Sequence, residues 1–384
     1  ITIRDCKIHN TGGANINVLD SDGEQRGLLV EQCDIGPSIG GDNFHFHEGT
    51  SAGTYSISNV GAIIRNNQLH GAGENAIDLK GAGDVVIDSN VIYACAGSNN
   101  GPVGGWNRFA LQTISCGGRR IADQIIIRRN VIYDGCSGIE IQGNDYKIYN
   151  NTLVANNRDY TGTDSEAQSD EQPRFVATKQ SEARTGIAFK NNIVSNHNSA
   201  EVGFSLSESG GSYDIDHNLY SNISGARFAN TSEGNFELYT FARWRDLLDT
   251  YDTVAGKDHN SLDATPGFVD VPPKPTGPPA QFDFRLRDDS PAIDSGGPLT
   301  WTTGPGEGKQ IQLEDARYFS DGLGLTDGDL IQVGREGPVR ITSVDYDRNI
   351  ITIDRSITWT DGDEVSLPYL GEGPDVGANE FEGN

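Results

Sequence analysis

The sequence contains no methionine and no long apolar run. A membrane-spanning helix needs about 20 consecutive apolar residues, and no segment approaches that length, so we expect no membrane insertion. The chain opens on ITIRDCKIHN, which alternates like a strand, without an initiator methionine or a signal peptide. We therefore expect that further sequence precedes it.

Basic residues are scarce. The 384 residues include 29 lysines and arginines against 55 aspartates and glutamates, which gives a formal net charge of −26. This charge repels phosphate backbones and anionic lipids, so nucleic acid is not an expected partner. The acidity suits a neutral glycan, or a ligand bridged by a cation, better than a bare polyanion.

Cysteine is rare as well, and its spacing matches no metal or redox motif. The five cysteines form no CxxC pair, which argues against a zinc knuckle or a thioredoxin-like site. The sequence also lacks a nucleophile-elbow motif and a phosphate-cradling loop. It therefore gives no case for an esterase or a nucleotide enzyme.

The sequence does contain a short repeat: an apolar alternating triplet, a polar pair, an asparagine and another apolar pair. Six copies are centred on Asn67, Asn90, Asn130, Asn151, Asn192 and Asn218, and two earlier copies carry Cys6 and Cys33 at the same place. Successive positions are 21 to 41 residues apart, so the pattern stays constant while loops of different length interrupt it. This is typical of a solenoid. We predict an all-β fold, a right-handed parallel β-helix.

Stacking of the coils gives these asparagines a structural role. Neighbouring coils lie about 4.7–4.9 Å apart, so each buried amide can donate to one coil and accept from the other. We predict an asparagine ladder rather than catalytic asparagines. Cys6 and Cys33 are neighbours in the same column, and we expect stacked free thiols because their side chains point the same way.

The chain changes character after the repeats. Apolar residues at helical spacing from Phe236 to Tyr251 predict a short capping helix, and a Pro-rich connector follows. Five alternating runs joined by DG-type turns then predict a small β-barrel or sandwich. We divide the chain into coils at 1–235, a helix, connector and cap at 236–298, an inserted β domain at 299–369 and a return strand at 370–384.

The repeats and the segments FARWRDLLDTYD, DATPGFVD, DFRLRDDSPAIDSGGP and PDVGANEFEG resemble bacterial right-handed β-helix repeat proteins. That superfamily includes pectate lyases and other polysaccharide lyases, and the resemblance covers most of the chain. It implies the fold and an extracellular or cell-surface location. It only suggests carbohydrate chemistry, because many such proteins have no assigned reaction.

A second family of strands lies between the asparagine turns: NINVL, NFHFHE, NAIDLKG, RFALQT, GIEIQG and GFSLSE. Strand side chains alternate, so placing the apolar residues inward sends their neighbours outward. The inward pairs are Ile16/Val18, Phe44/Phe46, Ile77/Leu79, Phe109/Leu111, Ile139/Ile141 and Phe204/Leu206. The two outward columns are Asn17, His45, Asp78, Ala110, Glu140 and Leu19, His47, Lys80, Gln112, Gln142.

These columns form the candidate site. We predict His45, His47, Asp78, Lys80 and Glu140 as catalytic residues, with Gln112 and Gln142 contacting substrate. Two loop insertions flank the columns, and one of them carries Trp106, which could stack on a sugar ring or equally anchor the loop. Arg108, just after this loop, is a further candidate for substrate binding.

Lyase chemistry on a uronic acid needs a base next to the carboxylate and a cation to neutralise the developing charge. Lys80 or His47 is the candidate base, and Arg108, or a calcium ion held by Asp78, is the candidate cation. The AIDLKG strand resembles the base-bearing strand of calcium-dependent pectate lyases, where a lysine takes this role. The clustered calcium-binding aspartates of that family have no clear match here, which leaves the metal unassigned.

Hydrolysis uses Asp78 and Glu140 instead, with His45 near enough to tune one pKa. Two coils separate their backbones by about 9–10 Å, which approaches the roughly 6.5–9.5 Å between carboxyls in inverting glycosidases. A non-enzymatic alternative is a surface, adhesive or filament-forming protein whose coils associate end to end. We predict a secreted carbohydrate-active protein that binds and cleaves a polysaccharide as a lyase or glycoside hydrolase, with calcium as the candidate cofactor.

Overall fold

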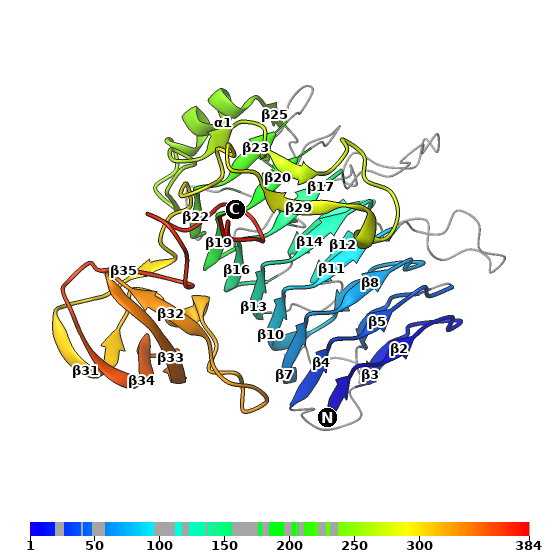
Figure 1. Cartoon of the computed structure of the whole chain (residues 1–384), viewed down its shortest axis with the longest axis horizontal. Helices are drawn as coiled ribbons and strands as arrows, with labels where there is room; N and C mark the ends of the chain where they lie inside the picture. The colour runs from blue at the N-terminus through cyan, green and yellow to red at the C-terminus, as the bar shows by residue number, and fades with distance from the viewer. Residues whose placement is uncertain are drawn as a thin grey trace.

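The chain folds into a parallel β-helix with three faces, and each coil adds one strand to each face (Figure 1). The computed structural model describes residues 1–19, 27–39, 41–47, 58–95, 112–116, 123–135, 137–141, 143–155, 176–178, 184–195, 202–204, 206, 211–221, 228–230 and 237–383. Over these residues there are three nine-stranded sheets. The predicted all-β fold, a right-handed parallel β-helix with a small C-terminal β unit, is confirmed.

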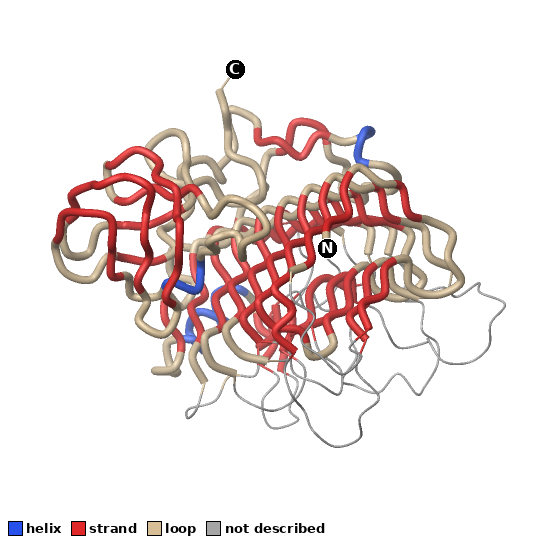
Figure 2. The backbone as a smooth tube through the Cα atoms, turned by 90° about the horizontal axis from the view of Figure 1, so that it is seen from below, coloured by secondary structure: helices blue, strands red, loops and turns tan. Residues whose placement is uncertain are grey.

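The three sheets follow one another along each coil. The first contains β1 (Thr2–Arg4), β4 (Leu28–Glu31), β7 (Ser58–Arg65), β10 (Ala82–Asp88), β13 (Asp123–Arg128), β16 (Tyr146–Tyr149), β19 (Ile187–Lys190), β22 (Tyr213–Asp216) and β26 (Val254–Ala255). The second contains β2 (Lys7–Ile8), β5 (Asp34–Ile35), β8 (Gln68–His70), β11 (Val91–Tyr93), β14 (Val131–Tyr133), β17 (Thr152–Val154), β20 (Ile193–Ser195), β23 (Leu219–Ser221) and β27 (Leu262–Asp263). The third contains β3 (Ile16–Leu19), β6 (Phe44–His47), β9 (Ile77–Leu79), β12 (Gln112–Cys116), β15 (Ser137–Ile141), β18 (Val176–Thr178), β21 (Val202–Phe204), β24 (Phe228–Asn230) and β25 (Glu237–Tyr239). Figure 2 shows these strands stacked in parallel rows along the helix.

A left-handed residue turns the chain from the first sheet to the second on eight coils. It directly precedes the ladder position, with φ between 51° and 57°, at Asp5, Gln32, Asn66, Ser89, Arg129, Asn150, Asn191 and His217. This conformation costs roughly 1–2 kcal/mol for a residue with a Cβ atom. The hydrogen bonds of the following residue offset that cost.

The predicted asparagine ladder is confirmed. Nδ2 of each asparagine donates to Oδ1 of the next one at 3.0–3.1 Å, from Asn67 through to Asn218. The backbone N–H of each asparagine donates to the same oxygen at 3.0 Å. The ladder ends where Asn218 donates to the side chains of Ser261 and the fully buried Asp258. At the other end, Cys6 and Cys33 are free, as expected.

The last coil lies beyond the predicted end of the coils at residue 235. The capping helix α1 (Phe241–Leu248) is shorter than expected, because Glu237–Tyr239 forms β25, which pairs antiparallel with β24. Trp244 and Leu248 of α1 are fully buried against the interior. Strands β26 and β27 then continue the first and second sheets. Of the described helices, none is long and apolar enough to cross a membrane.

The C-terminal unit is a six-stranded sheet that packs against the first sheet of the helix (Figure 1). Its strands are β30 (Thr300–Trp301), β31 (Gly306–Gln312), β32 (Leu330–Val333), β33 (Glu336–Asp345), β34 (Ile350–Trp359) and β35 (Glu364–Ser366). Five of these are the predicted alternating runs. A short hairpin of β28 (Phe268–Asp270) and β29 (Asp283–Leu286) precedes the unit and lies over the second sheet.

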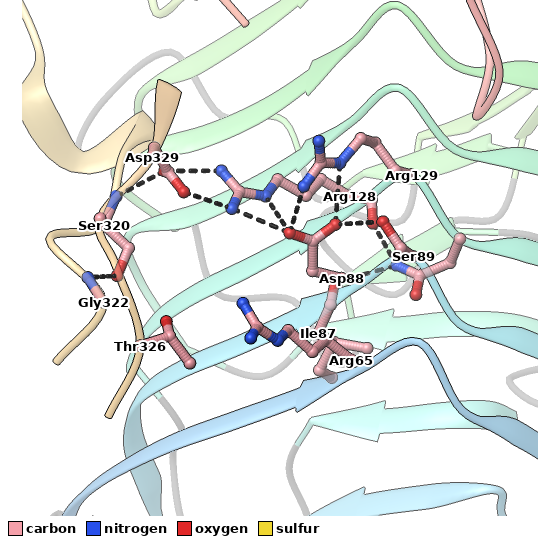
Figure 3. A network of polar contacts seen from close by, with 12 residues as sticks. Arg65, Ile87, Asp88, Ser89, Arg128, Arg129, Ser320, Gly322, Thr326 and Asp329 are labelled. Atoms are coloured by element: carbon pink, nitrogen blue, oxygen red, sulfur yellow. Dashed lines mark hydrogen bonds and ion pairs between the residues drawn. The ribbon is translucent and has the colours of Figure 1, made fainter. Parts of the chain in front are cut away.

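Buried charges join the six-stranded unit to the helix. Arg128 Nη1 and Nη2 donate to the two oxygens of Asp329 at 2.7 Å each, and Arg128 Nε donates to Asp88 at 3.0 Å (Figure 3). Lys147 lies 2.7 Å from Asp315 in the same interface. The Arg128–Asp329 and Lys147–Asp315 pairs link the β-helix to the C-terminal unit, and the Arg128–Asp88 pair links two neighbouring strands of the first sheet.

Candidate functional site

Strands β6 and β9 bring two candidate residues together. They pair in parallel with His45 opposite Asp78, while Phe44 and Phe46 lie opposite Ile77 and Leu79. The four apolar residues are buried in the main core. Because strand side chains alternate, His45 and Asp78 lie on the other face of the sheet, as predicted.

Asp78 lies at the centre of a cluster of charged groups. Its Oδ2 atom is 2.9 Å from Lys80 Nζ and 3.8 Å from His45 Nε2. The Asp78 residue is 1% exposed, whereas the side chains of His45 and Lys80 are 16% and 29% exposed. The sequence predicted an open patch of side chains here. In the structure the Asp78 carboxyl is buried, and the partly exposed imidazole of His45 and ammonium of Lys80 lie beside it.

Three further members of the cluster, which the sequence did not predict, lie in the turns before β6 and β9. Asp42 is buried, and its Oδ1 atom accepts from the backbone N–H and from Nδ2 of Asn75, both at 2.9 Å. Asp42 Oδ2 is 3.4 Å from His45 Nδ1. Glu74 is the third member, and its charge acts on both Asp78 and Lys80. The signal was an acidic residue followed by asparagine just before each strand, in GDNFHFH and GENAIDLK.

The cluster shifts the pKa values of its members. Burial raises the pKa of Asp78 to about 7, the charge of Asp42 adds to this shift, and Lys80 opposes it. Burial also raises the pKa of Asp42, against the two hydrogen bonds from Asn75. Burial lowers the pKa of Lys80, but the charges of Asp78, Asp42 and Glu74 outweigh it and raise that pKa above its ordinary value. Lys80 is therefore a cation near neutral pH, and Asp78 is a group that gains and loses its proton there.

Glu140 lies two strands from Asp78, but the residue between them is not the expected one. Ser115 of β12 pairs with Asp78 on one side and with Glu140 on the other. The prediction that Ala110 occupies this position was wrong, because Ile114 of β12 lies in the core opposite Ile77 and Ile139, which puts Ser115 level with Asp78. Phe109, Ala110 and Leu111 lie outside the described residues. Two strand spacings put the backbones of Asp78 and Glu140 about 9–10 Å apart. Glu140 is 8% exposed.

The other candidate residues are placed less fully. Gln112 pairs with Ser137, so it is not level with Lys80 as predicted. His47 is the last residue of β6, and its backbone pairs with Leu19. The side chain of His47 lies outside the described structure, as do the residues Trp106, Arg108 and Gln142.

Calcium, the candidate cofactor, fits this cluster poorly. Asp42, His45 and Asp78 each offer one ligand atom, and these atoms lie within 4.8 Å of one another. Calcium takes six to eight oxygen ligands, whereas this set includes a histidine nitrogen. The Lys80 ammonium already contacts Asp78. We assign the positive charge of the site to Lys80.

No protein-family model and no curated protein matches the chain. Among the solved structures that match is one described as the complex of XylC with xylose, at a TM-score of 0.39 and 14% sequence identity. The match covers 95% of this chain and 66% of that one, so the chain spans about two thirds of the length of this relative.

Proposed function

We propose that the chain is a carbohydrate-active enzyme that binds a polysaccharide against the third sheet and hydrolyses it, with Asp78 as the proton donor. The observation that carries this is the position of Asp78: 1% exposed, 2.9 Å from Lys80, and with a pKa of about 7. A general acid works best when its pKa lies near the working pH. Asp78 meets that condition and an ordinary surface aspartate does not.

Glu140 supplies the second carboxylate of the proposed reaction. In an inverting glycosidase the acid protonates the leaving oxygen, while a base about 6.5–9.5 Å away activates a water on the opposite face of the sugar. The two strand spacings between Asp78 and Glu140 support that arrangement. Lys80 keeps a positive charge beside Asp78, which suits a substrate with polar or acidic groups.

The chemistry of Lys80 makes β-elimination the second candidate. Its raised pKa favours a cation that neutralises a uronate over a base that removes a proton. A lyase of this kind would need another base, and His45 is the nearest described group. An extracellular location remains a prediction from the resemblance.

The test is cleavage of a panel of neutral and acidic polysaccharides by the purified protein, with and without added calcium. We expect new reducing ends without ultraviolet-absorbing unsaturated product, and a loss of about 10²-fold or more in rate for Asp78→Asn and Glu140→Gln. The matched control is Asp34→Asn, because Asp34 also pairs with a histidine, His70, but on the second sheet. Unsaturated product would identify a lyase instead. Full activity in Asp78→Asn would exclude the proposed proton donor, and no cleavage of any polysaccharide would favour a structural or adhesive protein.

A further inference from the structure

Asp42 and Asp78 are two buried carboxyls with different surroundings. Asp42 is 2% exposed and Asp78 is 1% exposed, and their nearest oxygens lie within 4.8 Å. Two carboxylates this close repel each other, so one of them holds a proton more readily than an isolated carboxyl does. The surroundings decide which one.

The hydrogen bonds favour the charge on Asp42. Its Oδ1 atom accepts two hydrogen bonds from Asn75, at 2.9 Å each. Donors of this kind stabilise the ionised form of a carboxyl. Asp78 receives a donor on one oxygen only, from Lys80. Its Oδ1 atom is buried and has no hydrogen-bond partner within the part of the chain that the structure describes.

We propose that Asp42 is a positioning residue: held by Asn75, it fixes the His45 imidazole against Asp78, and its negative charge favours the protonated form of Asp78. This inference rests on the proposed function, because it names the residue that prepares Asp78 to donate a proton. Asp42 itself contacts no reacting atom in the proposal.

The imidazole of His45 lies between the two carboxyls. Its Nδ1 atom is 3.4 Å from Asp42 Oδ2 and its Nε2 atom is 3.8 Å from Asp78 Oδ2. This orientation directs one ring nitrogen at each carboxyl. Lys80 and His45 both lie on the Oδ2 side of Asp78, whereas the Oδ1 atom is buried without a hydrogen-bond partner in the described structure.

The other charges around Asp78 act in both directions. Glu74, in the turn before β9, adds a second negative charge that favours protonated Asp78, whereas Lys80 favours the ionised form. His45, when protonated, also favours ionised Asp78. Removing the negative charge of Asp42 therefore favours the ionised form of Asp78 and lowers its pKa, because the positive charge of Lys80 is then opposed less.

The experiment is the Asp42→Asn variant of the whole chain, compared with wild type, Asp42→Glu and the matched control Asp34→Asn. Carbon-13 NMR follows the titration of the Asp78 carboxyl without substrate, and Asp78→Asn assigns its signal. We expect Asp42→Asn to lower the titration midpoint of Asp78 by about one pH unit or more. Asp42→Glu retains the charge and should keep the wild-type midpoint, as should Asp34→Asn.

An unchanged Asp78 midpoint in Asp42→Asn overturns the inference. If that variant does not fold, Asn75→Ala provides the test, because loss of its side-chain donor should lower the Asp78 midpoint in the same direction by a smaller amount. On a substrate that the enzyme cleaves, the alkaline limb of kcat should move by the same shift as the NMR midpoint. Since the NMR titration uses no substrate, it gives its answer even if every polysaccharide fails.

Discussion

Arg128 and Asp329, 201 residues apart in the sequence, form a two-pronged ion pair across the junction between the β-helix and the six-stranded unit. The side chain of Arg128 is 4% exposed and that of Asp329 is 11% exposed. Both oxygens of Asp329 accept hydrogen bonds from Arg128, and Asp88 accepts a further one from Arg128 Nε. The two parts of the chain are thus joined by a desolvated charge pair as well as by apolar packing.

Asp329→Asn should destabilise this junction strongly. The change leaves Arg128 with one carboxylate in a buried setting, and breaking such a pair costs about 3 kcal/mol or more. Urea unfolding monitored by tryptophan fluorescence measures the loss. The control is Glu336→Gln, whose partner Arg355 is half exposed, so that variant should differ little from wild type. Equal stability of the two variants would contradict the assignment of the junction.

Asn130→Ala should interrupt the ladder at its centre. The side chain donates to two backbone carbonyls and to Asn151, and accepts twice from Asn90. Its loss leaves several buried groups without partners, and we expect a cost of about 3 kcal/mol. Thermal and urea unfolding measure it, with the exposed Gln68→Ala, two coils away, as control. A midpoint indistinguishable from that of Gln68→Ala would show that the ladder is dispensable.

Asp258 should make stability depend on pH. Burial raises its pKa to about 6 in the folded chain, against hydrogen bonds from Ser261, Trp244 and Asn218. A carboxyl whose pKa is raised by folding contributes stability below its unfolded pKa near 3.8, and this contribution is lost as the pH rises through about 6. The stability of wild type relative to Asp258→Asn should therefore fall by up to about 3 kcal/mol between pH 4 and 7. A constant difference over this range would contradict the shift.

Lys80→Met should lower kcat by about 10²-fold, because Asp78 loses the one ammonium within contact distance in the described site. Lys80→Arg keeps a positive charge and should lose less. Kinetics on whichever polysaccharide the wild type cleaves measures both variants. Lys7→Met is the control, since Lys7 is an exposed lysine 3.6 Å from Asp34 on the second sheet. If Lys80→Met kept wild-type kcat, the charge of Lys80 would have no part in the reaction.

The repeated asparagines made most of the fold predictable. Each of them is a polar residue in an apolar setting that only stacking can satisfy, so the pattern carries long-range information in a local sequence. Asn67 and Asn90 could be placed in one column although inserted loops vary the distance between copies. The five alternating runs near the C-terminus were predictable for a different reason. Alternation of apolar and polar residues shows which side chains lie on each face of a sheet.

The register of β12 was not predictable in the same way. The segment RFALQTISC offers two overlapping alternations, and one places Leu111 inward while the other places Ile114 inward. These differ by an odd number of residues, so the wrong choice reverses every side chain. Asp42 and Asn75 were missed because they lie in turns, where no periodicity marks which side chains meet.

The ladder also determines how distances in this protein can change. Every rung between Asn67 and Asn218 makes the same bonds, so the helix can lengthen or shorten only by complete coils, whereas its loops can vary residue by residue. The backbone separation of Asp78 and Glu140 can therefore change only in fixed steps. One intervening coil sets it, and an added coil would increase it by about 4.8 Å. Any tuning of the distance between these carboxyls finer than that step has to come from side-chain conformation.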